Sequence, residues 1–334
     1  MSKAVMVTGG AGYIGSHAAK ALARAGYRPI AYDSLVRGHR EAVRWGPLVE
    51  GDLADRALVI DTIRRFDITA VMHFAAFAYV GESMTRPDLY FRNNVVNSLG
   101  LLEAMRETGV KAMVFSSTCA TYGVPEKVPI AEDAPQRPVN PYGESKLMIE
   151  RALHWHGIAH GLAHVALRYF NAAGADPEGE AGELHEPETH LIPLVLHAAL
   201  GRRAEIEIYG TDYPTPDGTA IRDYIHVSDL ADAHVRALAY LEAGGVSTAL
   251  NLATGHGCSV REVVAAAERV TGRRVPSREV GRRAGDPAVL VADPTRAKET
   301  LGWTPRFSDL DTIIASAWNW ERGRNAAPRS NGRQ

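Results

Sequence analysis

Tyr142 and Lys146 stand four residues apart and together have the chemistry to move a proton to or from a hydroxyl group. They belong to the run Asn140-Pro141-Tyr142-Gly-Glu-Ser-Lys146. Asn before Pro is typical of a helix start, so both side chains are expected on one helical face. Free tyrosine has a pKa near 10 and is only about 0.1% phenolate at pH 7. A nearby cation favours the phenolate, so we expect Lys146 to lower the pKa of Tyr142.

A glycine-rich turn near the N-terminus predicts a dinucleotide site. Gly9, Gly12 and Gly15 have the spacing G-x-x-G-x-x-G between an apolar strand pattern and an alanine-rich helical pattern. Without side chains, the backbone N–H groups can approach a pyrophosphate at the helix N-terminus. Asp33 ends the next strand pattern, 18 residues after Gly15, where a carboxylate accepts hydrogen bonds from a ribose 2′-OH and repels a 2′-phosphate. We expect NAD, whose cationic nicotinamide further favours the phenolate of Tyr142; the alternative is a glycine turn without nucleotide.

The elements that must position these residues alternate between strand and helix patterns. Apolar strand-like runs cover residues 4–7, 29–32, 48–51, 70–74, 112–115 and 162–167. Continuous apolar character with helices between the runs indicates a parallel sheet covered on both faces. The expected fold class is α/β, a Rossmann-type doubly wound parallel sheet with a smaller C-terminal α/β substrate-binding lobe.

Ligands on such a sheet bind at the carboxyl ends of the strands. Three small or polar clusters follow the third, fourth and fifth runs, at residues 52–53, 74–78 and 116–118. Asp52 has the chemistry to bond an adenine amino group, although solvated loop aspartates are common. Asn93 precedes an amphipathic run and either reaches the nicotinamide side of the cofactor or caps a helix.

Length and composition set the remaining expectations. The chain has 334 residues, a formal net charge of −2 and two cysteines, Cys119 and Cys258. We expect no nucleic-acid or membrane partner and a reducing, cytoplasmic location. The expected domains are an NAD-binding domain over 1–170, to which segments around 222–253 return, a substrate-binding lobe over 171–322, and a disordered tail over 323–334.

An ordered set of motifs over nearly the whole chain resembles the sugar-nucleotide 4-epimerases of the extended short-chain dehydrogenase family. The set is TGGAGYIGSH, HFAA, VGES, SSTCATYG, NPYGESK, LRYFNAAGAD, GTDYPTPDGTAIRDYIHVSDLADAH and RRAGDPA. The resemblance implies interconversion of UDP-glucose and UDP-galactose. In that reaction Tyr142 takes the proton of the sugar 4-OH, the C4 hydride passes to NAD, the 4-keto sugar turns over, and the hydride returns to its other face. It also implies a homodimer formed by two helices per subunit, one in 86–109 and one carrying Tyr142.

The resemblance also assigns roles to individual positions. Thr118 bonds the sugar O4, while Lys146 binds the ribose and tunes Tyr142. The positions that match NAD contacts are Gly9, Gly12, Tyr13, Ile14, Gly15, Asp33, Asp52, Leu53, Phe74, Ala75, Ala76, Asn93, Ser116, Tyr142, Lys146 and Phe170. The positions that match substrate contacts are Thr118, Tyr142, Asn171, His190, Leu191, Tyr209, Arg222, Arg283, Asp286 and Leu290. Among these, the two arginines clamp the diphosphate, Asp286 bonds the uridine ribose, Tyr209 packs near the uracil, and Leu290 sets the room beside the hexose.

Several alternatives remain. Related dehydratases place an Asp-Glu pair after the active-site Thr, where this chain has Cys119 and Ala120, which cannot supply the protons. UDP-arabinose or UDP-xylose 4-epimerases and enzymes for UDP-N-acetylhexosamines are closer alternatives, and a non-catalytic NAD-binding regulator belongs to another class. No metal is expected, because His185 and His190 are five residues apart around a proline and do not fit the helical H-E-x-x-H pattern.

Overall fold

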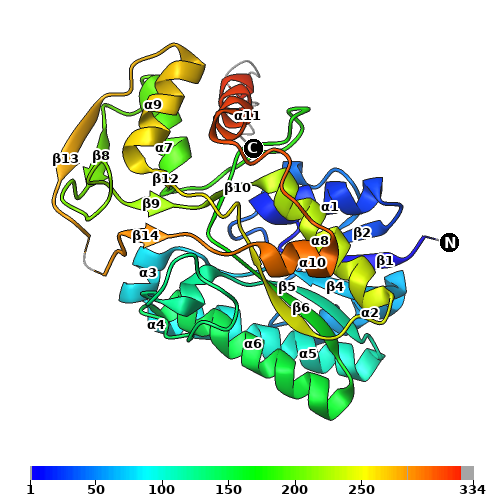
Figure 1. Ribbon diagram of the computed structural model, residues 1–334. Helices are drawn as coiled ribbons and strands as arrows, with labels where there is room; N and C mark the ends of the chain where they lie inside the picture. Colours follow the sequence, from blue (N-terminus) through cyan, green and yellow to red (C-terminus); the bar gives the residue numbers. More distant parts are fainter. Residues whose placement is uncertain (1, 284, 325–334) are drawn as a thin grey trace.

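A seven-stranded parallel sheet lies at the centre of the structure, a computed structural model that describes residues 2–283 and 285–324 (Figure 1). Its strands are β1 (Ala4–Thr8), β2 (Arg28–Asp33), β3 (Leu48–Glu50), β4 (Ile68–His73), β5 (Ala112–Ser116), β6 (Ala163–Tyr169) and β11 (Thr248–Leu252). Their order is β3-β2-β1-β4-β5-β6-β11, the doubly wound order with one strand added. The chain direction across the sheet reverses between β1 and β4, which is where such a sheet binds its ligand.

Helices cover both faces of this sheet. One face carries α2 (Arg56–Phe66), α5 (Asn97–Thr108) and α6 (Pro141–His160), and the other carries α1 (Tyr13–Arg24), α8 (Val227–Glu242) and α10 (Thr295–Leu301). Strand β1 shows why its sequence is apolar throughout: Ala4 and Met6 pack into the first core, while Val5 and Val7 pack into the second. The predicted fold class is therefore confirmed.

The segment 222–253 contributes both α8 and β11. Strand β11 pairs with β6 in register Thr248↔Val165, and α8 packs against α1. The chain thus leaves the sheet after β6 and later adds a strand to the same edge.

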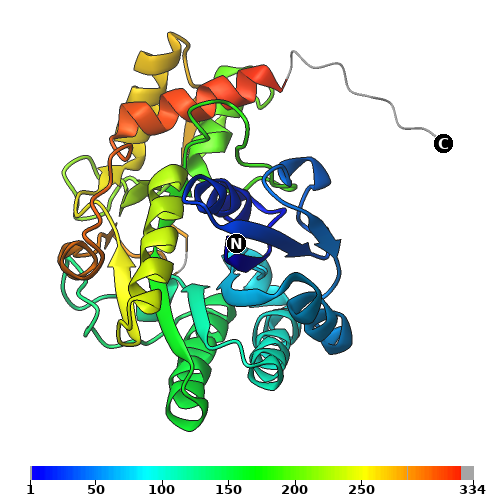
Figure 2. The same cartoon turned by 90° about the vertical axis from the view of Figure 1, so that its right-hand side faces the viewer.

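A smaller lobe stands over the carboxyl ends of the strands, at the upper left of Figure 1. Its helices are α7 (Leu191–Ala199), α9 (Val260–Thr271) and α11 (Leu310–Gly323), which share a third apolar core. Three small sheets accompany them: β7 (Asn171–Ala173) with β10 (Tyr224–His226); β8 (Ile206–Tyr209) with β13 (Ser277–Val280); and β9 (Ile221–Arg222) between β12 (Cys258–Ser259) and β14 (Val289–Leu290). Figure 2 shows this lobe above the sheet, with α11 (red) crossing its upper part.

The remaining elements are short and lie mostly near the strand ends. They are the 3-10 turns η1 (Arg40–Ala42) and η3 (Cys119–Tyr122), the helices α3 (Val80–Thr85) and α4 (Pro87–Tyr90), and the π-helical segment η2 (Phe91–Val96). The π-helical segment η2 stands between α4 and α5, just before the predicted amphipathic run, and such segments often mark functional sites. Among the described residues, no helix combines the length and apolar character needed to cross a bilayer. The tail predicted over 323–334 lies outside the described residues from 325 onward, and its first residue, Gly323, ends α11.

Candidate active site

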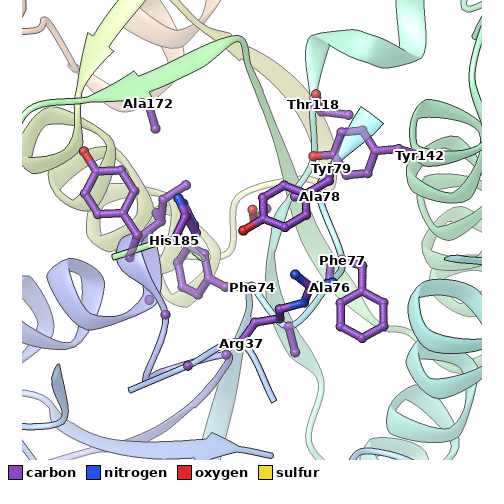
Figure 3. A pocket seen from close by; sticks show the side chains of 18 of the residues that line it. Arg37, Phe74, Ala76, Phe77, Ala78, Tyr79, Thr118, Tyr142, Ala172 and His185 are labelled. Atoms are coloured by element: carbon purple, nitrogen blue, oxygen red, sulfur yellow. The ribbon is translucent and has the colours of Figure 1, made fainter. Parts of the chain in front are cut away.

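A cavity of about 460 Å³ lies between the carboxyl ends of the sheet strands and the smaller lobe (Figure 3). A second cavity, of about 930 Å³, continues it into the lobe, and the two share Arg37, Tyr79, Asn171, His190 and Arg222 among their walls. Every predicted cofactor position lines the first cavity. Of the predicted substrate positions, Thr118, Tyr142 and Leu290 line the first, Leu191, Tyr209, Arg283 and Asp286 line the second, and the others line both. The structure therefore gathers all the predicted site residues along one continuous hollow.

The glycine turn after β1 has the shape that a pyrophosphate needs. A Cβ on Gly15 would lie 2.1 Å from the carbonyl oxygen of Gly9, so only glycine lets α1 approach the turn. Gly9 has φ +74°, and a Cβ there would meet the backbone N of Ala75 at 2.7 Å. A Cβ on Gly12, the residue before α1, would have one neighbour, the Gly9 carbonyl oxygen at 3.2 Å. Gly12 thus leaves open space at the helix N-terminus, which fits a bound diphosphate.

Asp33 holds the end of β2 against this turn. Its carboxylate accepts hydrogen bonds from the backbone N–H of Ala11 at 2.9 Å and of Leu35 at 2.8 Å. Burial raises the pKa of Asp33, and these two hydrogen bonds oppose that effect. The carboxylate is therefore fixed at the cavity wall, in the place where the Rossmann fold binds a ribose.

The polar positions on the α5 side are also held by neighbours. Asp52 accepts a hydrogen bond from Asn97 at 3.2 Å, and Asn93 donates to the side chain of Asn94 at 3.0 Å. Asn93 belongs to the π-helical segment and lines the cavity, so the interruption of the α-helix lies at the site itself.

The N-terminus of α6 positions Tyr142 and Lys146. Asn140 caps the helix by accepting a hydrogen bond from the backbone N–H of Gly143 at 2.8 Å, and Pro141 occupies the first turn. Lys146 is buried and its Nζ donates to the carbonyl oxygen of Ser116 at 2.8 Å. The ring of Tyr142 and the side chain of Thr118 lie beside each other at one side of the cavity (Figure 3).

The structure corrects the expectation about the acidity of Tyr142. Burial raises the pKa of Tyr142 to about 12, and a hydrogen bond with Thr118 offsets only part of that rise. Lys146 has its Nζ 6.0 Å from the centre of the Tyr142 ring, and burial lowers the pKa of Lys146 to about 7, against the attraction of Glu150. Lys146 is not among the groups that lower the pKa of Tyr142 here, so the effect of burial dominates. A further cation beside Tyr142 would lower this pKa, and the nicotinamide of bound NAD would supply one.

The substrate-side residues form contacts among themselves. Arg222 pairs with the carboxylate of Asp286, and the guanidinium of Arg283 lies 3.8 Å from the centre of the Tyr209 ring. Leu290 packs beside the cluster of Cys119 and Tyr122. The two arginines predicted to clamp a diphosphate therefore stand on the same cavity wall, and one of them already has a carboxylate partner.

Sequence reasoning missed several cavity residues. The guanidinium of Arg37 lies over the rings of Phe77, at 5.4 Å, and Tyr79, at 4.9 Å. Glu183 and His185 also line the cavity, near His190. Burial lowers the pKa of His190, but the charges and hydrogen bonds of Glu183 and Glu188 outweigh this effect and raise it to about 10. A signal was present in the sequence: Glu183-Leu-His185 and Glu188-Thr-His190 repeat one acid–His spacing.

A buried network behind the site was also missed. Arg168 on β6 pairs with Glu150 on α6, and it donates to the hydroxyl of Tyr122 at 2.9 Å. That hydroxyl donates to Asn251 on β11 at 2.8 Å, and Ser117 donates to Glu150. The network ties α6, and with it Tyr142, to the sheet.

Comparisons with known proteins agree with this geometry. The family described as "NAD dependent epimerase/dehydratase family" matches residues 5–253. A UDP-glucose 4-epimerase of Rhizobium leguminosarum bv. trifolii is 53% identical over 321 residues, covering 96% of this chain and 98% of the relative. The crystal structure of a UDP-glucose 4-epimerase from Brucella ovis in complex with NAD is similar with a TM-score of 0.94 and 55% identity, covering 95% of this chain and 98% of that one.

A third similar structure bears on the substrate. The UDP-glucose 4-epimerase of Stenotrophomonas maltophila with bound NAD and formylated UDP-arabinopyranose has a TM-score of 0.94 and 40% identity, covering 98% of this chain and 100% of that chain. The family model matches residues 5–253, and the similar proteins named above cover nearly the whole chain. Both findings agree with the glycine turn, Asp33 and Tyr142 of the site. This chain therefore belongs to the NAD dependent epimerase/dehydratase family.

Proposed function

We propose that this protein is an NAD-dependent isomerase that interconverts UDP-glucose and UDP-galactose at C4 through a transient 4-keto sugar. The observation that carries the proposal is that Thr118 and Tyr142 face the cavity that the glycine turn and Asp33 also line. Bound NAD supplies the acceptor for the C4 hydride and returns it. The similarity to UDP-glucose 4-epimerases over nearly the whole chain supports this reading.

The side chains of this chain handle the proton and the position of the sugar. Tyr142 accepts the proton of the 4-OH as the hydride leaves and gives it back when the hydride returns. Thr118 hydrogen-bonds Tyr142 and stands close enough to orient the same oxygen. Arg222 and Arg283 bind the diphosphate, which leaves the sugar free to turn between the two half-reactions. For Arg222 to do so, it must exchange its pairing with Asp286 for the phosphate oxygens.

The test is to add UDP-galactose to the purified protein and to follow product mass and cofactor absorbance. We expect an isobaric product, UDP-glucose, with no net NADH, and NAD that copurifies and survives dialysis. Tyr142→Phe keeps its fold and its NAD but loses at least ~10²-fold in activity, the scale of a removed general acid/base. Net NADH, or near-normal turnover by Tyr142→Phe, contradicts the proposal. A protein that holds NAD but converts no UDP-sugar is instead the non-catalytic regulator.

Two related activities share the site chemistry. A pentose substrate, UDP-arabinose or UDP-xylose, needs the same Tyr142 and Thr118, and the Stenotrophomonas structure holds a UDP-pentose derivative. UDP-N-acetylhexosamines need more room beside Leu290. We propose the plain hexose pair as the preferred substrates, and kcat/KM for the three sugar classes decides the order.

We further propose that the protein forms a homodimer through α5 and α6. These two helices pack together, and they expose large apolar side chains: Val96 (beside α5), Leu99, Met148, Trp155 and Ile158. Met148 and Trp155 are seven residues apart on α6, so they share one face. An apolar face of this kind is typical of an interface, and a second copy buries it.

Light scattering tests the dimer. We expect twice the monomer mass for the wild type and monomer mass for Trp155→Glu. Val246→Glu, at a similarly exposed apolar position in the loop before β11, is the control that stays dimeric. Monomer mass for the wild type removes the proposal.

We also propose a domain organisation and a location in the cell. An NAD-binding domain spans 1–170 with 222–253 returning to it, and a substrate-binding lobe spans 171–322. Free cysteines at Cys119 and Cys258 fit a reducing cytoplasm.

A further inference from the structure

Four metal-ligating side chains converge in the segment between β7 and α7. They are Glu183, His185, Glu188 and His190, and one ligand atom from each lies within 4.8 Å of all the others. The Nδ1 atoms of both histidines approach the same oxygen of Glu183, at 2.9 Å for His185 and 2.8 Å for His190. Glu188 completes the group, with carboxylate oxygens 2.9 Å from the Nδ1 of His190 and 3.8 Å from that of His185.

These separations match a four-coordinate ion. Zinc binds imidazole nitrogen and carboxylate oxygen at about 2.0–2.2 Å, so a tetrahedral set of ligand atoms lies roughly 3.3 Å apart. The observed 2.8–3.8 Å between the histidine nitrogens and the carboxylate oxygens brackets that value. Two carboxylates balance a divalent charge once the ion has displaced the proton of His190 and both imidazoles are neutral. The donor set of two nitrogens and two oxygens suits Zn²⁺ or a similar transition ion.

The local chain explains how residues so close in sequence can share one point. The segment is not helical, which agrees with the argument against a helical H-E-x-x-H site. Instead, each histidine contacts the carboxylate two residues before it, at 2.9 Å in both cases. Glu183 and His185 form one such pair and Glu188 and His190 form another, with Pro187 between the pairs.

The segment is anchored before any ion binds. The indole N–H of Trp320 on α11 donates to the carbonyl oxygen of Glu183 at 3.1 Å, and His39 contacts the carbonyl oxygen of Leu184 at 3.1 Å. The ring of His185 lies edge-on to Tyr13, with centroids 6.2 Å apart. Glu183 is buried, so its carboxylate is held inside the protein, where it requires compensation by cations.

We propose that Glu183, His185, Glu188 and His190 form a binding site for one divalent transition-metal ion of the Zn²⁺ class. The ion joins the two halves of the segment and fixes His190 at the start of α7, where His190 lines both cavities. It is a positioning site, since the hydride and proton steps are complete without it. The proposal stands apart from the epimerase reaction, because it depends only on these four side chains.

The test uses Co²⁺, whose visible absorption reports coordination. The probe is added to untagged full-length holoenzyme with bound NAD, after chelator treatment and dialysis. We expect saturable binding of one Co²⁺ per chain with the d–d bands of a four-coordinate site, displacement by Zn²⁺, and a higher melting temperature with Zn²⁺. His185→Asn and Glu183→Gln should each weaken binding at least ~100-fold, because losing even an outer-shell partner costs 10- to 100-fold.

The control is His156→Asn. His156 and His160 are four residues apart on α6 with ring centroids 5.4 Å apart, an alternative histidine pair on the surface. This variant should bind Co²⁺ as the wild type does. NAD retention and circular dichroism confirm that His185→Asn is folded. Absence of saturable binding by the wild type, or equal binding by folded His185→Asn, overturns the proposal and leaves the cluster as ion pairs held by protons alone.

Discussion

The amino group of Lys146 donates a hydrogen bond to the carbonyl oxygen of Ser116 at 2.8 Å, which joins the first turns of α6 to the end of β5. Lys146 is fully enclosed and also lies 4.9 Å from the centre of the Phe115 ring. The lysine therefore fixes the position of Tyr142 relative to the sheet, and its own protonation couples to folding.

Lys146 should make the stability of the cofactor-free protein depend on pH. Burial lowers its pKa from 10.5 to about 7, so the unfolded chain binds one more proton between these values. Its contribution to the free energy of unfolding is present above pH 10.5 and is lost as pH falls to about 7, with a slope of up to about 1.4 kcal/mol per pH unit.

Urea unfolding of wild type and Lys146→Met at pH 6.5, 8 and 9.5 measures this contribution. We expect the difference, wild type minus variant, to rise with pH; a constant difference contradicts the shift. Tyr142 ionises only above this range.

The glycine turn allows a matched pair of substitutions. In Gly15→Ala the new methyl meets the Gly9 carbonyl oxygen at 2.1 Å, so α1 must move and the protein should lose about 3 kcal/mol or fail to fold. In Gly12→Ala the nearest atom is 3.2 Å away, so the fold should survive while the methyl occupies the space for the pyrophosphate. We expect Gly12→Ala to lose much less urea stability than Gly15→Ala when both lack NAD, and to bind NAD at least ~10-fold more weakly than the wild type. Gly81→Ala on α3, with open space around it, is the neutral control. Wild-type NAD affinity in Gly12→Ala would place the cofactor elsewhere.

The buried pair of Arg168 and Glu150 should be among the most sensitive positions outside the cavity. Their side chains are only 6% and 9% exposed, so removing one charge leaves the other uncompensated. We expect Glu150→Gln to cost about 3–5 kcal/mol of unfolding free energy. Glu126→Gln breaks a pair with Arg137 in which both side chains are mostly exposed, and should cost less than about 1 kcal/mol. Equal midpoints in urea for these two variants would show that the buried network is not needed.

These sites differ in how far the sequence alone could predict them. Strand β1 could be predicted because both its faces are buried, which makes the run apolar throughout. Tyr142 and Lys146 could be placed on one face because helical spacing is local. The pairing of Arg168 with Glu150, and the rise in the pKa of Tyr142, depend on burial produced by β6, β11 and the lobe, which no local pattern records. The convergence of Glu183 with His190 is hidden for another reason, since the helical metal pattern does not apply to a segment without regular structure.

Leu290 tests which sugar the cavity accepts. It lies on β14, in register with Arg222 on β9, and lines the cavity together with Thr118 and Tyr142. The sugar must turn over beside it between half-reactions, so a larger side chain restricts rotation as well as binding. One methylene in a pocket changes discrimination by only about 1–3 kcal/mol. Leucine is intermediate in volume and should therefore disfavour an acetamido group without excluding it.

The measurement for Leu290 is kcat/KM for UDP-hexose, UDP-N-acetylhexosamine and UDP-pentose on wild type, Leu290→Ser and Leu290→Tyr. We expect the wild type to prefer the plain hexose pair, to use N-acetyl sugars weakly and to accept pentoses as side substrates. Leu290→Ser should raise the ratio of N-acetylhexosamine to hexose by about 10-fold, and Leu290→Tyr should lower it by a similar factor, since 1.4 kcal/mol is tenfold. Because Leu290 makes its backbone contacts through β14 and these are unchanged, both variants should keep NAD and the fold. If neither substitution moves the ratio, other residues set the room beside the sugar, and the role given to Leu290 is wrong.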